Sequence, residues 1–171
     1  MNMTAGSASS QVLSVSHLNS AGQFQAVMNA EMMAQSPHFA MHRLSLLASS
    51  PLEATSDNPT SQSLIFQGGS YWVGVVVSKR NAKKAVRRNL LRRQIYQVAK
   101  ESSNGLDNGA HVVRLRRPFD AKEFKSASSD LLKKAVRAEL LELFAKTGQR
   151  VQSPSTFRPP RHFKPKAKTP S

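Results

Sequence analysis

The stretch Tyr71–Ser78, YWVGVVVS, constrains the fold of this chain more than any other segment. It is rich in β-branched residues and carries apolar side chains at both odd and even positions, which predicts a strand that is apolar on both faces. Such a strand belongs in the middle of a sheet. We therefore expect residues 71–78 to form the central strand of the fold.

The residues that follow this strand predict a helix and a second strand. Segment 82–102 is expected to be a helix, because its apolar residues recur at helical spacing and Ser103-Asn104-Gly105 is a typical C-terminal stop signal. Residues 110–115 then form another apolar strand. A helical crossover joins strands that run in the same direction, so the two strands are expected to be parallel.

Further elements are expected on either side of this strand-helix-strand unit. In chain order they are a helix from residue 18 to about 33, a strand at 38–47, a possible short strand at 64–66 and a final helix from 128 or 129 to 146. Either Asn19 or Ser20 can cap the first helix, which ends before Pro37. The element order predicts an α+β fold, a two-layer sandwich of a central mixed sheet and packed helices.

Composition divides the chain into one domain and three less ordered segments. Residues 1–17 are rich in Ser, Ala, Thr and Met and are expected to be a disordered extension. The domain covers residues 18–147, with a polar loop insertion at 48–69. Residues 148–171 mix five prolines with Ser, Thr, Arg and Lys, and this basic tail is also expected to be disordered.

The net charge of +15 is concentrated in two parts of the chain. No acidic residue lies between Asp57 and Glu101, a window that contains nine cations within 22 positions, and none follows Glu142. An ordinary solvated helix would interleave Glu with Lys at helical spacing. Unpaired charge of this density favours a polyanionic partner, and nucleic acid is the leading class.

Several other classes of protein are excluded by the composition. The absence of cysteine excludes disulfides, thiolate metal sites and cysteine nucleophiles. No apolar run approaches the roughly 18 residues that span a bilayer, and the first 42 residues contain no Lys or Arg, which argues against a signal or transit peptide. We expect a cytoplasmic location. Because the acidic residues and histidines are scattered, neither a catalytic site nor a metal site is expected in the protein, and His38 and His42 are interpreted as ordinary strand positions.

The basic helix predicts a packing face and a binding face. Leu91, Ile95 and Val98 form one stripe, whereas Asn89, Arg93 and Tyr96 lie roughly opposite and Arg92 lies to one side. Arg87 and Arg88 flank the apolar stripe, where their stems can pack while the guanidinium groups reach solvent. Asn89 has poor helix propensity, so its amide is either a specific donor and acceptor or an ordinary exposed group.

The segment Ser78–Arg93, SKRNAKKAVRRNLLRR, resembles the protein subunit of bacterial ribonuclease P. The signature of that family is a Ser-Lys-Lys strand end followed by a helix with Ala-x-x-Arg-Asn-x-x-Lys-Arg. Here it reads Ser78-Lys79-Arg80, then Ala85, Arg88-Asn89 and Arg92-Arg93. Weaker matches extend the resemblance to residues 18–146, and they are Phe24-Gln25-Ala26-Val27, the strand Val73–Val77, and Val112-Val113 with the basic turn at 114–118.

The chain also departs from the family pattern. Tyr96-Gln97 replaces an Arg-Glu pair, so no role is assigned to these two positions. His42 stands where the family often has an aromatic residue. The basic residues that usually precede the first helix are absent, and the tail at 148–171 is longer than is typical.

The resemblance implies a ribosomal protein S5 domain 2-like fold and a subunit that helps a catalytic RNA to remove 5′ leaders from precursor tRNAs. Catalysis would belong to ribonuclease P RNA and its Mg²⁺ ions, and the protein alone would be inactive. Phe24 and His42 would line a cleft for the leader, although Phe24 could equally be a core residue. The residues implied in RNA binding are Lys79, Arg80, Lys83, Lys84, Arg87, Arg88, Asn89, Arg92 and Arg93.

Other functions are compatible with the basic composition. A general RNA-binding or ribosome-associated protein could use the same sandwich without a processing role. A membrane-surface helix would need a bulky apolar face that this helix requires for the core. A DNA-binding helix would lack a zipper or a helix-turn-helix pair, and a nuclease acting without RNA would lack carboxylates.

Overall fold

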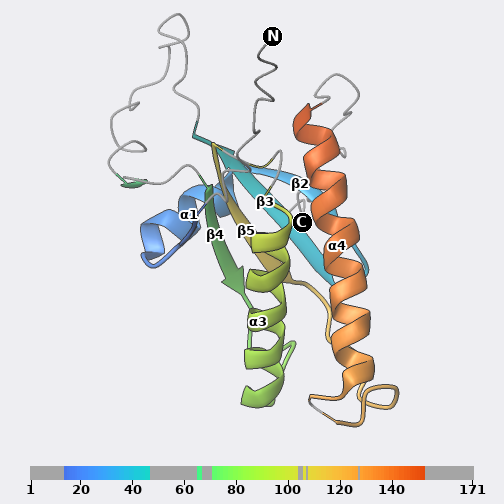
Figure 1. Ribbon diagram of the computed structural model, residues 1–171. Helices are drawn as coiled ribbons and strands as arrows, with labels where there is room; N and C mark the ends of the chain where they lie inside the picture. The colour runs from blue at the N-terminus through green and yellow to red at the C-terminus, as the bar shows by residue number, and fades with distance from the viewer. Residues whose placement is uncertain are drawn as a thin grey trace, which may run out of the picture.

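The computed structural model describes residues 14–46, 65–66, 71–103, 106, 108–126 and 128–152. Within these residues five strands and three long helices follow one another along the chain (Figure 1). In order they are β1 (Val15–His17), α1 (Ala21–Asn29), β2 (Glu31–Gln35), β3 (Phe39–Ser45), β4 (Tyr71–Val76), α3 (Ala85–Glu101), β5 (Gly109–Leu115) and α4 (Asp130–Gln152).

The strands form a single mixed sheet in the order β1-β4-β5-β3-β2. β4 pairs in parallel with both β1 and β5, whereas β3 is antiparallel to β5 and to β2. The predicted parallel pairing of the two strands around the basic helix is confirmed, with Tyr71 opposite Gly109 and Val76 opposite Arg114. The predicted α+β class, with a mixed sheet and packed helices, is also confirmed.

Helices α3 and α4 cover one face of the sheet (Figure 1) and enclose the larger core. Odd-numbered side chains of β4, among them Tyr71 and Val73, are fully buried against Leu91 and Ile95 of α3. The Tyr71 hydroxyl donates a hydrogen bond to the Ala99 carbonyl at 3.1 Å. The apolar stripe predicted for the basic helix therefore packs on the sheet.

Helix α1 covers the opposite face of the sheet, where even-numbered residues of the strands form a second core with Val27. Ser20 caps this helix, as predicted for one of two candidates. Its hydroxyl accepts a hydrogen bond from the Gln23 N–H, and the Gln23 side chain accepts one from the Ser20 N–H. This reciprocal capping box fixes where α1 begins.

The first helix is shorter than predicted, and the difference is the strand β2. The apolar stripe was expected to continue to about residue 33, but α1 ends at Asn29 and residues 31–35 pair with β3. Strand pairing satisfies the backbone groups of this segment, and Met32 lies opposite His42. Tertiary contact with β3 outweighs the local helical pattern.

The expected limits of the domain also need correction. Residues 15–17, assigned to a disordered extension, form a strand beside β4, with Val15 opposite Tyr71. Residues 148–152, assigned to the tail, belong to α4, where Arg150 donates hydrogen bonds to the Met32 and Met33 carbonyls. The helix 82–102 starts three residues later than expected, at Ala85. Most of the predicted N-terminal extension, loop insertion and tail lies outside the described residues, at 1–13, 47–64, 67–70 and 153–171. Ile65 and Phe66, expected in a short strand, instead pack near Trp72.

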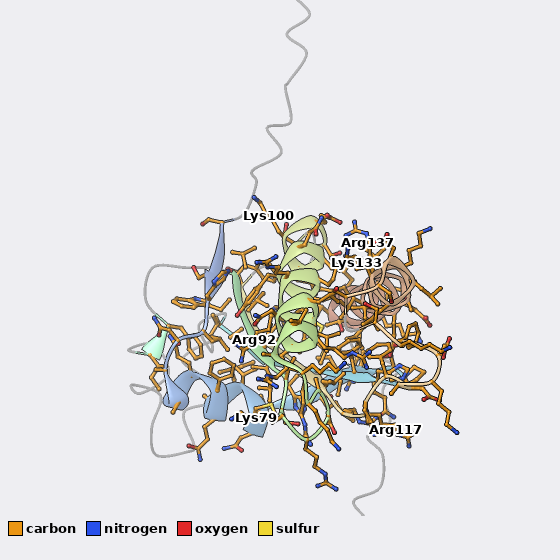
Figure 2. The ribbon with its side chains drawn as sticks, turned by 90° about the horizontal axis from the view of Figure 1, so that it is seen from below. Lys79, Arg92, Lys100, Arg117, Lys133 and Arg137 are labelled. Atoms are coloured by element: carbon orange, nitrogen blue, oxygen red, sulfur yellow. The ribbon has the colours of Figure 1, made fainter. Side chains whose placement is uncertain are left out.

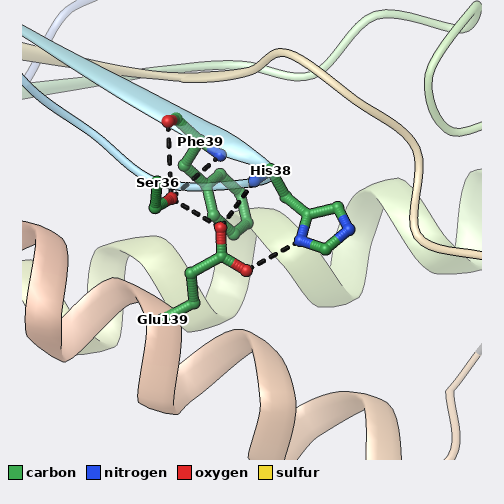
Figure 3. A network of polar contacts seen from close by, with 4 residues as sticks. All are labelled: Ser36, His38, Phe39 and Glu139. Atoms are coloured by element: carbon green, nitrogen blue, oxygen red, sulfur yellow. Dashed lines mark hydrogen bonds and ion pairs between the residues drawn. The ribbon is translucent and has the colours of Figure 1, made fainter.

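A polar cluster joins α4 to the turn between β2 and β3 (Figure 3). Glu139 accepts hydrogen bonds from the Ser36 hydroxyl at 2.5 Å and the His38 N–H at 2.6 Å. Its second oxygen lies 2.8 Å from His38 Nδ1, and the His38 ring stacks on Phe119 with centroids 3.9 Å apart. Because three donors converge on one largely buried carboxylate, this contact positions α4 over the edge of the sheet.

We predict that Gly74→Ala destabilises the protein by about 1 to 3 kcal/mol through overpacking. A Cβ at residue 74 would lie 2.6 Å from both Leu18 Cδ1 and Phe24 Cε1. Urea unfolding measures the change. Gly22→Ala in α1 is the matched control, because its Cβ would meet nothing within 4 Å, and it should raise stability by about 0.5 to 1 kcal/mol. Equal stability of Gly74→Ala and wild type would contradict the close approach of α1 to β4.

We also predict that acid weakens the fold through His111. Burial, with the nearby charge of Arg43, lowers the pKa of His111 from 6.5 to about 3. Between these pH values the unfolded chain takes up a proton that the folded protein excludes, so the free energy of unfolding falls as the pH drops from 6.5 towards 3. Replacing His111 with Gln removes this titration, and chemical denaturation from pH 7 to 4 should show a smaller loss of stability than in wild type.

Candidate nucleic-acid interface

The nine residues predicted to bind RNA form one continuous region. Lys79, Arg80, Lys83 and Lys84 lie in the loop between β4 and α3, and the others lie on α3 itself. Figure 2 shows Lys79 at the lower end of α3 and Arg92 and Lys100 along its side. The structure therefore brings together a set of residues that the sequence placed on a strand end and a helix.

Arg87 faces the protein rather than solvent. It is half-buried, and its guanidinium donates hydrogen bonds to the carbonyls of Phe119, Phe124 and Ser126 at 3.4, 2.6 and 3.3 Å. These bonds hold the segment between β5 and α4 against the start of α3. The prediction that the Arg87 guanidinium reaches solvent is therefore wrong. The three carbonyls that it bonds lie more than thirty residues away in sequence, so the local pattern could not reveal them.

Arg88 forms hydrogen bonds with the loop that precedes its own helix. Its Nη1 atom donates to the carbonyls of Ala82 and Lys83 at 2.9 and 2.7 Å. Helix α3 has no side-chain cap and no acidic residue in its first turn. Arg88 is half-buried, and it holds the loop that carries the lysines against the first turn of α3.

The exposed face of α3 is formed by Asn89, Arg92, Arg93 and Lys100. Because residues three, four and seven apart share a helix face, these side chains form one stripe, the basic stripe, that runs along most of the helix. Tyr96 lies within this stripe and is half-buried. The arginines present planar donors suited to phosphate oxygens, and the Asn89 amide is accessible as both donor and acceptor.

A hollow of about 600 Å³ lies beside the start of α3. Arg80, Lys83 and Lys84 line one side, and Pro118, Phe119 and Phe124 contribute apolar surface. Asp120 is the acidic residue in this lining. The cations of the loop therefore surround a concave surface rather than a flat one.

Phe24 and His42 lie on the other face of the sheet, the one that carries α1. Gly74, Val112 and His42 are aligned across β4, β5 and β3, and the Phe24 ring lies directly over Gly74. Two strand spacings therefore separate the backbone beneath Phe24 from His42, roughly 10 Å. Both side chains are half-buried, and burial lowers the pKa of His42. A neutral, partly exposed imidazole at this position can stack on an unpaired base.

Sequence reasoning did not identify Arg114 and Arg116 as site residues. Both are exposed, and together with Arg80 they line a second hollow of about 630 Å³ at the carboxyl ends of β4 and β5. The alternation of side chains between the two faces of β5 could have identified Arg114 from the sequence. Ala110 and Val112 face α1, so Arg114 must project from the same face of the sheet.

Two findings concern other kinds of site. Among the described residues, no group of three or more His, Asp or Glu side chains could hold a metal ion. None of the helices in the part of the chain that the structure describes is long and apolar enough to cross a membrane.

Comparisons with known proteins agree on one family. The sequence profile of the family described as Ribonuclease P matches residues 14–139. The ribonuclease P protein component of Ralstonia pickettii strain 12J is 24% identical over 143 residues, which cover 84% of this chain and 86% of that protein. The solved structure of the Staphylococcus aureus RNase P protein superimposes with a TM-score of 0.51 at 16% identity, covering 75% of this chain and 92% of that chain. This structural likeness shows a shared fold.

We predict that Arg87 and Arg92 differ in their effect on stability. Arg87→Ala removes donors from three backbone carbonyls and should cost about 1 to 3 kcal/mol. Arg92→Ala, on the exposed face of the same helix, should change the free energy of unfolding by less than about 0.5 kcal/mol. Thermal and urea unfolding followed by circular dichroism measure both. If the two variants are equally stable, Arg87 belongs to the exposed stripe.

Proposed function

The chain belongs to the ribonuclease P protein family, and from this premise we propose that it binds ribonuclease P RNA and the 5′ leader of precursor tRNA. It is the protein component of ribonuclease P, and the enzyme assembled with it processes tRNA. The observation that carries the RNA-binding proposal is the exposed stripe of α3. Asn89, Arg92 and Arg93 lie on its solvent side, and the apolar side chains that α3 uses for packing lie on the other.

The basic stripe and the β4–α3 loop would contact the catalytic RNA. Neither the loop nor the first turn of α3 contains an acidic residue, so phosphate groups would relieve the repulsion among these cations. Release of condensed counterions adds to the affinity. If about six phosphates are neutralised, the logarithm of the association constant should fall with the logarithm of salt concentration at a slope on the order of −4 to −5.

The face of the sheet beside α1 would receive the leader. Phe24 and His42 offer ring faces to unpaired bases, and Arg114 and Arg116 offer charge to the phosphates beyond them. Stacking on aromatic faces is tolerant of sequence, as a leader that differs from one tRNA to the next requires. Phe24 would serve both packing and binding, because it lies over Gly74 and is only half-buried.

Under this proposal the chemistry belongs to the RNA and the Mg²⁺ ions that it binds. Mg²⁺ prefers oxygen ligands and keeps several waters, so RNA phosphates are suitable partners. The protein would lower the Mg²⁺ requirement by neutralising phosphates near the cleavage region. It would position the substrate by binding the leader.

We predict that the purified chain lowers the Mg²⁺ concentration at which ribonuclease P RNA cleaves precursor tRNA. The added cations replace part of the charge that Mg²⁺ must otherwise neutralise. Cleavage is measured as release of the 5′ leader over a Mg²⁺ titration, with RNA alone and protein alone as references. Protein alone should release no leader.

Arg92→Gln combined with Arg93→Gln is the matched variant, because neither side chain belongs to the packing face. It should retain the wild-type circular dichroism spectrum and bind the RNA more weakly, with a smaller salt dependence. If wild-type protein binds the RNA but leaves its Mg²⁺ dependence unchanged, the chain is a general RNA-binding protein without a processing role.

A further inference from the structure

His17 and Tyr96 form an aromatic pair at the edge of the basic stripe. Their ring centroids lie 4.3 Å apart with an interplanar angle of 26°, which is a stacked arrangement. His17 ends the edge strand β1, and Tyr96 comes from the middle of α3. Two segments almost eighty residues apart in sequence therefore build one flat surface.

The register of the sheet explains why these two side chains meet. His17 lies opposite Val73, and Val73 belongs to the core beneath α3, so the His17 side chain projects from the same face. Tyr96 is half-buried and packs against that core. His17 is exposed, so the Tyr96 ring is held in the fold and the His17 ring stacked on it is accessible to solvent.

Cations flank the pair on α3. Arg92 and Lys100 lie four residues before and after Tyr96, and therefore occupy the same side of the helix. Figure 2 shows both on the side of α3 that faces β1, whereas Lys133 and Arg137 belong to α4, on the other side of α3. Burial raises the pKa of the Tyr96 hydroxyl above its ordinary value, and the nearby charge of Arg92 offsets part of this rise.

An accessible ring between an arginine and a lysine suits a nucleotide, whose base can stack while its phosphates meet the cations. We propose that the His17–Tyr96 pair is a stacking site for an unpaired base of RNA, on the opposite face of the sheet from Phe24 and His42. The inference rests on the proposed function for the identity of the RNA as ribonuclease P RNA. The stacking itself requires only a single-stranded segment.

The first test uses a twelve-nucleotide oligoadenylate and the full chain, without catalytic RNA. His17→Leu fills a similar apolar volume but has no π face, and it should weaken binding about 5- to 150-fold, the range that base stacking of roughly 1 to 3 kcal/mol implies. His17→Phe restores a ring and should bind at least as tightly as wild type. Fluorescence anisotropy of a labelled oligonucleotide measures the affinities.

Salt dependence separates stacking from charge. The slope of log affinity against log salt should be the same for His17→Leu and wild type, whereas Arg92→Gln should reduce its magnitude by about 0.7, the value for one phosphate on a single strand. Ser16→Ala is the control in the same strand, because Ser16 lies opposite Trp72 and its side chain points to the α1 face. It should bind as wild type does.

Wild-type affinity of His17→Leu would overturn the inference and leave the ring pair as a cover for the edge of the core. A loss of affinity that His17→Phe fails to restore would overturn it as well. Because the assay contains no catalytic RNA, its result is independent of the Mg²⁺ titration. If the protein leaves the Mg²⁺ dependence of cleavage unchanged but His17→Leu binds oligoadenylate more weakly, the processing role is excluded and the stacking site is supported.

The absence of cysteine from the chain allows a direct check of the position. Lys100→Cys, exposed and one turn after Tyr96 on the same side of α3, can carry a single photoreactive group. Crosslinking to ribonuclease P RNA should map to unpaired nucleotides, and His17→Leu should reduce its yield. Crosslinks confined to double-helical RNA would contradict a stacking role.

Discussion

Burial of β4 on both faces is the constraint on which the rest of the structure depends. Its odd-numbered side chains enter the core beneath α3 and α4, and its even-numbered ones enter the core beneath α1. Both cores are therefore built on the same six residues. Helix α3 follows β4 after a short loop and must lie back on the sheet, so Arg92, Arg93 and Lys100 are confined to the face that packing leaves free.

The start of α3 shows how far this charge distribution opposes stability. Cations at Lys83, Lys84 and Arg87 surround the positive end of the helix dipole, where each would cost about 0.3 to 1 kcal/mol at an exposed site. Backbone carbonyls compensate in part, because Arg87 and Arg88 together donate to five of them. The lysines have no comparable compensation in the sequence around them, which contains no acid between Asp57 and Glu101. A polyanion would relieve what remains.

The sequence correctly predicted the elements whose conformation is determined by residues close together in the chain. The centre of the sheet, the basic helix and β5 follow from apolar runs and a stop signal that lie within one segment of chain. Strand β2 could not be predicted, because its pairing with β3 is what makes residues 31–35 extended. The inward orientation of Arg87 depends on carbonyls 32 to 39 residues away. The placement of the residues implied by the resemblance could be predicted from the sequence. Alternation along β5 could give the face of Arg114, but only the folded sheet brings Arg114 and Arg116 together with Arg80.

The loop between β4 and α3 connects the two candidate RNA surfaces. Arg80 lines both hollows, the one beside the start of α3 and the one at the ends of β4 and β5. Asn81 fixes this loop, since its amide nitrogen donates to the Leu115 and Arg116 carbonyls at 2.9 and 3.1 Å. These two hydrogen bonds hold the loop against the end of β5, beside the exposed Arg114 and Arg116. A protein that holds one RNA while it orients the leader of another needs two surfaces in such a fixed relation.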